Sequence, residues 1–169
     1  MSNEQTEIGW TPADHLPGPS LYFEDLVVGT RYTLPSRTQT SGLFAAFQAA
    51  SGDNDPIHYD RPYCQARGHR DMLAHGMQVL IQSAAGAGNF PEQVADSLIG
   101  FVDLTCRFRA AVYIGDTLYP ELVISELIEQ NTTGVVVMEV TVRNQDGVRV
   151  LEGEHRYLLR KRDTQRVVK

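Results

Sequence analysis

The chain has 169 residues and a formal net charge of −6 at pH 7, and 42% of its residues are hydrophobic, which suits one globular domain with a substantial core. The negative charge argues against a general nucleic-acid binder, which needs a basic surface, and no apolar run approaches the roughly 20 residues of a membrane span. Cys64 and Cys106 are too few for a disulfide scaffold and lack CxxC spacing, so we expect a cytoplasmic protein that binds neither nucleic acid nor membrane.

The N-terminal segment, residues 1–20, is polar and lacks the apolar stretch of a signal peptide, so we expect an irregular arm there. A single domain is expected over residues 21–162, followed by a basic tail over 163–169. Near its start, residues 31–34 fit a short strand. Thr40 and Ser41 are suited to cap a helix, whose apolar side chains recur at helical spacing until Gly52 ends it.

The segment from Ser51 to Met77 interrupts the helical pattern. It begins with Ser51-Gly52-Asp53-Asn54-Asp55-Pro56-Ile57-His58, which is rich in turn-forming residues, and it ends with His75-Gly76-Met77. Roughly twenty residues without clear periodicity separate two helical patterns, and a loop of that length in a compact domain is usually functional or disordered. Its aromatic and apolar side chains argue against disorder. We therefore expect the chemistry here, where a carboxylate and an imidazole lie close in sequence.

The segment over residues 76–88 is apolar on nearly all sides, which predicts a buried helix. Beyond Pro91, alternating and apolar segments predict strands over 102–110, 117–128, 133–143 and 148–160, with a hairpin turn at Asn144–Gly147. Short turns between consecutive strands indicate an antiparallel meander.

These elements predict an α+β fold in which one long antiparallel sheet wraps the buried helix, the arrangement known as the hot-dog fold. An open sheet leaves an edge strand with unpaired backbone groups. Pairing that edge across a two-fold axis would cover it, so we expect a homodimer or a higher homo-oligomer.

The composite motif formed by residues 51–58 and 75–77 resembles the signature of the MaoC-like dehydratases, also called (R)-specific enoyl-CoA hydratases. Phe23-Glu24-Asp25-Leu26 and Gly115-Asp116-Thr117-Leu118 are similar to further features of that family, so the resemblance covers the chain from about Leu21 to Arg162. Two positions depart from the family pattern. Asp55 stands where Asn usually precedes the proline, and Ala84 stands where some members carry serine.

The resemblance implies a hydro-lyase of fatty acid metabolism that acts on acyl-CoA without a metal or redox cofactor. It would hydrate trans-2-enoyl-CoA to (R)-3-hydroxyacyl-CoA and catalyse the reverse dehydration. Asp53 and His58 would be the catalytic pair, and the Gly76 amide would bind the thioester oxygen.

This reaction has three requirements: the attacking water must lose a proton, C2 must gain one, and negative charge on the thioester oxygen must be stabilised. A carboxylate and a neutral imidazole that share one water can act as general base and general acid. A backbone N–H at the start of a buried helix can stabilise the oxygen. The sequence leaves open which of Asp53 and His58 takes the proton from water.

Residues beside this trio are candidates for substrate binding. His75 and Met77 flank Gly76, and His75 is also expected to orient the turn before the helix. Asp55 is a further candidate, although its carboxylate fits the role of capping its own loop. Arg160 and Lys161 are candidate ligands for the phosphates of coenzyme A, and the alternative for both is a solvated chain end.

Other interpretations stay open. Asp53 and His58 also fit a turn-capping Asp and a loop His bonded to backbone, and the chain could be a hot-dog thioesterase or a non-catalytic acyl-thioester-binding protein. No metal site is expected, because the calcium-loop and HExxH patterns are absent from the sequence. A short or medium acyl chain is expected by analogy with family members of this length.

Overall fold

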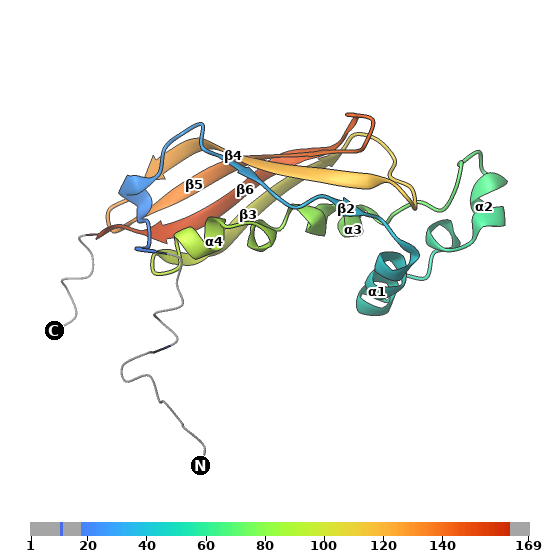
Figure 1. Ribbon diagram of the computed structural model, residues 1–169, viewed down its shortest axis with the longest axis horizontal. Helices are drawn as coiled ribbons and strands as arrows, with labels where there is room; N and C mark the ends of the chain where they lie inside the picture. Colours follow the sequence, from blue (N-terminus) through green and yellow to red (C-terminus); the bar gives the residue numbers. More distant parts are fainter. Residues whose placement is uncertain (1–10, 12–17, 163–169) are drawn as a thin grey trace, which may run out of the picture.

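A six-stranded antiparallel sheet dominates the computed structural model of the chain (Figure 1). The structure describes Thr11 and residues 18–162. The arm expected over residues 1–20 therefore lies almost wholly outside the described residues, and the basic tail expected over 163–169 lies entirely outside them. The strands are β1 (Arg31–Thr33), β2 (Arg37–Thr38), β3 (Leu98–Phe108), β4 (Thr117–Glu129), β5 (Thr133–Arg143) and β6 (Arg149–Arg160).

The strand order is β1-β4-β5-β6-β3, with β2 also paired to β4. The expected hairpins β4–β5 and β5–β6 are confirmed, but the simple meander is wrong for the first long strand. β3 pairs with β6 at the far edge, where Leu104 lies opposite His155. The connection over 109–116 is not a tight turn: it links β3 at one edge of the sheet to β4 near the other. Its backbone bonds to the loop before α3, where Ala74 donates to Val112 and Ile114 donates to Met72.

The core lies on one face of this sheet. Side chains of a strand alternate between its two faces, so every second residue of β4 and β5 points to that face. Among them Leu122, Ile124, Val136 and Met138 are fully buried. Burial of such a side chain contributes roughly 1.5–3 kcal/mol to folding, so this face supplies much of the free energy that holds the sheet in one shape.

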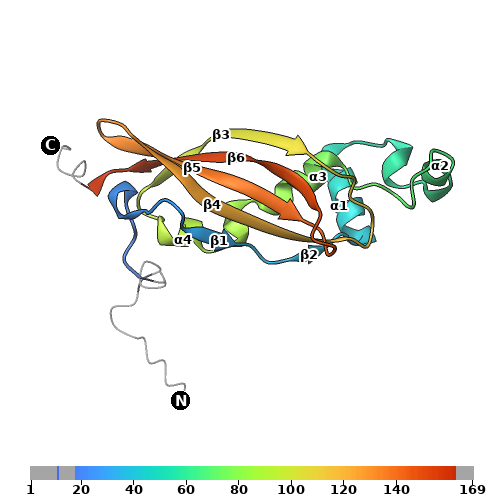
Figure 2. The same ribbon diagram turned by 90° about the horizontal axis from the view of Figure 1, so that it is seen from above.

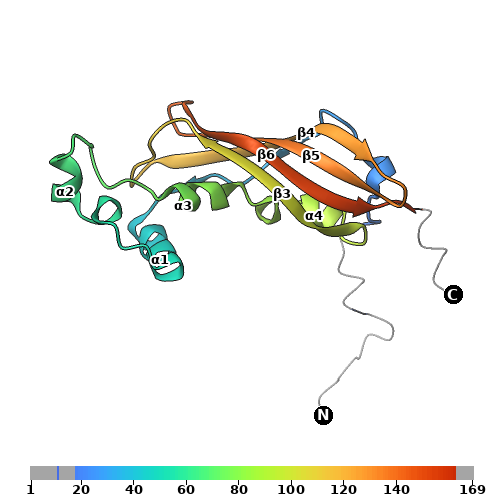
Figure 3. The same ribbon diagram turned by 180° about the vertical axis from the view of Figure 1, so that it is seen from behind.

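A helical run lies along the core face, as Figures 1 and 3 show from opposite sides. It consists of α3 (Gly76–Leu80), 3-10 helices over Ile81–Ser83 and Ala85–Ala87, and α4 (Phe90–Gln93). A sheet folded over a central helical run is the expected hot-dog arrangement. The prediction of one continuous buried helix over 76–88 is wrong, however, because Ala84 has an extended backbone with ψ of 120°.

Two side chains account for the change from an α-helix to 3-10 helices after α3. Ser83 donates its hydroxyl to the Leu80 carbonyl, and Gln82 donates its amide to the Gln78 carbonyl. Such local bonds compete with the backbone ladder of an α-helix. The run is also exposed on one side, where Met77 and Ile81 keep 51% and 54% of their surface accessible.

The remaining helices sit at one end of the sheet, seen from above in Figure 2. α1 (Ser41–Ser51) is capped by the Thr40 hydroxyl, which accepts from the Leu43 amide, and Gly52 ends the helix in a left-handed conformation with φ of 70°. Both features confirm the expectation from sequence. The segment after α1 holds a 3-10 helix (Pro56–His58) and α2 (Arg61–Gln65). Within the described part of the chain, no helix is long and apolar enough to cross a membrane.

Candidate active site

Asp53 lies directly after the left-handed Gly52, so its side chain turns back toward the start of α3. One carboxylate oxygen accepts from the Asp55 amide at 3.0 Å, and the other accepts from Nε2 of His75 at 2.8 Å. The Asp55 amide is the largest cause that lowers the pKa of Asp53 below its usual value, and His75 and His58 contribute in the same direction. Asp53 is therefore a carboxylate at neutral pH.

His58 ends the short helix over 56–58, which the Asp55 carboxylate caps by accepting from the Ile57 amide at 3.0 Å. Its Nδ1 lies 2.9 Å from the carbonyl oxygen of Leu73. A carbonyl oxygen only accepts, so Nδ1 carries the proton of the neutral ring and Nε2 keeps a free lone pair. Within the described residues, no group is bonded to that Nε2, so it is free to accept a proton.

His75 is the N-cap of α3, and its Nδ1 accepts from the Met77 amide at 3.0 Å. The same reasoning places its proton on Nε2, which faces Asp53. The ligand atoms of Asp53, His58 and His75 all lie within 4.8 Å of one another. A metal ion would need three unprotonated ligand atoms, and the protonated Nε2 of His75 is not one. The trio fits a hydrogen-bonded site better than a metal centre.

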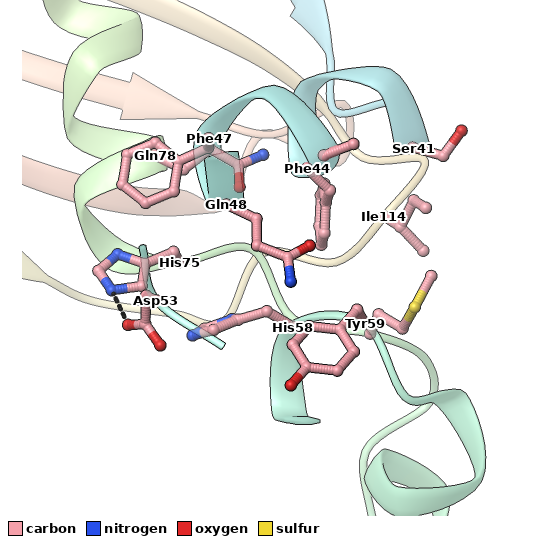
Figure 4. A pocket seen from close by; sticks show the side chains of 12 residues that line it. Ser41, Phe44, Phe47, Gln48, Asp53, His58, Tyr59, His75, Gln78 and Ile114 are labelled. Carbon is pink, nitrogen blue, oxygen red and sulfur yellow. Dashed lines mark ion pairs between the residues drawn. The ribbon is translucent and has the colours of Figure 1, made fainter. Parts of the chain in front are cut away.

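The trio borders a cavity of about 170 Å³ between α1 and the loop that leads to α3 (Figure 4). An engineered apolar cavity of about 150 Å³ holds a benzene molecule, so this space suits a small organic group. Most of the remaining wall is apolar, and its side chains include Phe44, Ala45, Phe47, Met72 and Ile114. The cavity thus places an ionised carboxylate and a free imidazole nitrogen beside a small apolar space.

Gln78, which the sequence gave no reason to select, also lines this cavity and bonds to a second buried amide, Gln39. Gln39 is fully buried and donates to the Arg37 carbonyl, so its oxygen is the acceptor for the Gln78 amide at 3.1 Å. Gln78 is 2% exposed and lines the cavity. Gln78 interrupts an apolar stretch, and a glutamine inside an apolar helix face is the signal that would have found it.

Gly76 lies at the first position of α3, and within the described residues its N–H has no acceptor. A side chain here would come within 3.0 Å of the Phe108 ring, so glycine permits this close packing. Gly76 lines a second groove of about 350 Å³, bounded also by Leu73, Val79 and Phe108. The start of α3 therefore borders both spaces, with Gly76 lining the groove and His75 lining the cavity. Because α3 has only five residues, its helix dipole is small. The Gly76 N–H would therefore stabilise a negative charge through one hydrogen bond and not through the dipole of a long helix.

The other predicted binding residues lie farther away or have structural partners. Arg160 is the last residue of β6 and Lys161 follows it, at the end of the sheet opposite α1 (Figures 1 and 2). Lys161 bonds to Glu129 at 2.5 Å. The structure does not bring either residue near Asp53. Asp55 caps the helix over 56–58, and Met77 is half exposed on α3.

Comparisons with known proteins add the following. A family model described as a MaoC like domain matches residues 25–147. A 3-hydroxybutyryl-CoA dehydratase from Methylorubrum extorquens is 29% identical over 136 residues, covering 79% of this chain and 81% of the relative. The structure of R-hydratase PhaJ1 from Pseudomonas aeruginosa aligns with a TM-score of 0.70 at 26% identity, covering 84% of this chain and 87% of that one. A Mycobacterium tuberculosis protein with a double hotdog fold aligns with a TM-score of 0.71 at 24% identity, covering 83% and 44% of the two chains, and shows the shared fold.

Proposed function

The chain belongs to the MaoC-like dehydratase family, and from this premise we propose that it hydrates trans-2-enoyl-CoA to (R)-3-hydroxyacyl-CoA and catalyses the reverse dehydration. The observation that carries this proposal is the pairing of an ionised Asp53 with His58, whose Nδ1 bonds to the Leu73 carbonyl; the functional atoms of the two residues lie within 4.8 Å of each other at one cavity. The names of the dehydratase and R-hydratase relatives support the same reaction.

The hydrogen bonds give the two residues different roles: His58 transfers the protons, and Asp53 orients the water. Asp53 stays ionised, so it orients the water and stabilises positive charge, and it is a poor proton donor. The free Nε2 of His58 takes a proton from water as the oxygen attacks C3. The imidazolium then returns a proton to C2, so one water is added in total and His58 ends neutral. Proton transfer by a positioned side chain is typically worth about 10²–10⁴-fold in rate.

Gly76 supports the third requirement of the reaction. Gly76 lines the groove beside Phe108, and its N–H has no acceptor among the described residues, so a thioester oxygen that reaches this N–H would gain a hydrogen bond. Loss of one such donor costs on the order of 10²–10³ in rate.

The acyl end would then occupy the cavity of about 170 Å³, and the pantetheine arm would lie along the groove. This size favours short acyl chains.

The reaction changes no oxidation state overall, so we propose that it needs neither a redox cofactor nor a metal ion. Cys64 and Cys106 are both free thiols, which supports a reducing compartment and hence a cytoplasmic enzyme of fatty acid metabolism.

We also propose a homodimer. The edge strand β3 and the neighbouring helical run expose Met77, Ile81, Phe101 and Phe108, each by more than half of its surface. Such a patch beside a sheet edge is typical of an interaction site. Sedimentation of the wild type should give a dimer, and Ile81→Glu should shift it toward the monomer; a monomeric wild type would contradict the proposal.

The function is tested with purified protein and crotonyl-CoA. We expect loss of the ultraviolet absorbance of the enoyl thioester, formation of (R)-3-hydroxybutyryl-CoA, and no release of free thiol to a thiol-reactive dye. His58→Ala should keep the fold and lose most of this activity. Thiol release without hydration would instead indicate a thioesterase, and binding of acyl-CoA without turnover would indicate a non-catalytic protein. Either result would overturn the proposal.

A further inference from the structure

His75 makes two hydrogen bonds that point in opposite directions along its ring. Nδ1 accepts from the Met77 amide at 3.0 Å, and Nε2 lies 2.8 Å from a carboxylate oxygen of Asp53. A backbone amide only donates, so the neutral ring is held in the tautomer with its proton on Nε2. That proton is therefore directed at Asp53 without His75 having to be charged.

The ring of His75 also packs against two other rings. Phe47 of α1 packs with ring centroids 5.0 Å apart, and His58 packs with ring centroids 4.9 Å apart. Three separate elements thus fix its place: α1, the short helix over 56–58 and the start of α3. The side chain is 24% exposed. Among the described residues, Asp53 and His58 are the titratable groups in direct contact with it, because α1 contributes only Phe47.

Asp53 receives one donor on each oxygen, from the Asp55 amide and from His75. The first donor comes from its own turn, and only His75 ties the carboxylate to α3, the helix that begins with Gly76. A carboxylate held at two points cannot rotate freely, and this one lines the cavity in the orientation that the two donors fix. Positioning of this kind matters because a misplacement of about 1 Å can cost about 10²-fold in rate.

We propose that His75 is a positioning residue that holds Asp53 in its working orientation and couples it to the start of α3. This inference rests on the proposed hydratase function. The competing explanation is that His75 only caps α3, in which case its contact with Asp53 has no consequence for turnover.

Two substitutions separate these roles. In His75→Asn, the amide oxygen is as many bonds from Cα as Nδ1 is, so it can still cap the Met77 amide but cannot reach Asp53. In His75→Gln, the amide nitrogen is as many bonds from Cα as Nε2 is, so it can still donate to Asp53 but no longer matches the cap. His69→Asn is the matched control, because His69 lies in the same loop but contacts Tyr113 instead.

We expect His75→Asn to unfold at the wild-type temperature but to lose about 10- to 100-fold in kcat with little change in KM. His75→Gln should recover part of that kcat while unfolding at a lower temperature, and His69→Asn should behave like the wild type. Wild-type kcat in His75→Asn would overturn the proposal, as would a kcat for His75→Gln no higher than that of His75→Asn.

A second readout does not depend on turnover. Carbon-detected NMR titration of the Asp53 carboxyl should show a higher pKa in His75→Asn than in the wild type, because a donor to the charged form is lost. An unchanged Asp53 pKa would contradict the proposal. If the wild type lacks hydratase activity, the proposed function fails, and the titration still decides whether His75 holds Asp53.

Discussion

The β4–β5–β6 sheet and the segment from Gly52 to Leu80 are held together by different forces. The sheet buries fully enclosed side chains such as Ile124 and Met138 on one face. The segment depends on single hydrogen bonds between loop atoms, as at Asp53, and that side chain is 37% exposed. Apolar burial is non-directional, whereas a hydrogen bond fixes direction. Stability should therefore depend chiefly on the sheet, and orientation of the reacting groups on the segment.

The largest effect on stability is expected in the sheet. Ile124→Ala removes a fully buried side chain and should lower the free energy of unfolding by about 2–5 kcal/mol, because it loses apolar burial and leaves a cavity. Chemical denaturation measures this. The fraction that remains folded should turn over substrate at the wild-type rate. Glu126→Ala, at an exposed position of the same strand, is the control and should change little. A loss of specific activity in folded Ile124→Ala would contradict the proposal that the sheet governs stability and the segment governs orientation of the reacting groups.

The next effect concerns pH. His155 is 4% exposed on the core side of β6, near Ser83, Tyr157 and the Phe101 ring, and burial lowers its pKa from 6.5 to about 4. His155 therefore binds a proton below pH 6.5 in the unfolded chain, but only below about pH 4 in the folded chain. Stability should be full above this window and should fall by up to about 3 kcal/mol as the pH drops through it.

The variant His155→Gln isolates this contribution. Carboxylates with lowered pKa values also make the protein less stable in acid. They include Asp53, and Glu152, whose pKa is lowered to about 2 by Arg109 and Arg149. The difference between wild type and variant in denaturation at several pH values removes that shared background. The wild type should lose more stability than the variant between pH 6.5 and 4, and parallel curves would contradict the assignment to His155.

The smallest effect is expected at α1, which packs on the segment from Gly52 to Leu80 through Phe47. Thr40→Ala removes the hydroxyl that caps α1 and should cost about 1 kcal/mol in unfolding free energy. Thr40→Ser keeps a capping hydroxyl and should restore most of it. Because Phe47 of α1 packs on His75, a small fall in kcat should accompany Thr40→Ala. A large fall in kcat with no change in stability would show that the cap serves the site rather than the helix.

The sequence was most informative where one periodic pattern or one turn residue decides the local structure. The alternation in residues 133–143 predicted β5 at its observed bounds, and Gly52 predicted the end of α1. The pairing of β3 with β6 was not predictable from periodicity, because that pattern identifies a strand and not its neighbour. The break at Ala84 depends on side-chain bonds of Ser83 and Gln82, which hydrophobicity does not encode.

The candidate site shows the same division. The resemblance selected Asp53 and His58, and the structure brings their functional atoms within 4.8 Å of each other and of His75. The tautomers of both histidines depend on backbone partners at Leu73 and Met77, which exist only after the loop has folded. Arg160 and Lys161 were selected by charge alone, and charge does not indicate which end of a sheet a residue occupies.

The most direct measurement compares two carboxylates two positions apart in one loop. Asp53→Asn removes the charge that orients the water, whereas Asp55→Asn keeps an oxygen that can still cap the helix over 56–58. We expect kcat/KM for crotonyl-CoA hydration to fall by about 10²-fold in Asp53→Asn, because the water is no longer oriented, and to stay near the wild-type value in Asp55→Asn, with both variants unfolding close to the wild-type temperature. Full activity in folded Asp53→Asn would contradict the account.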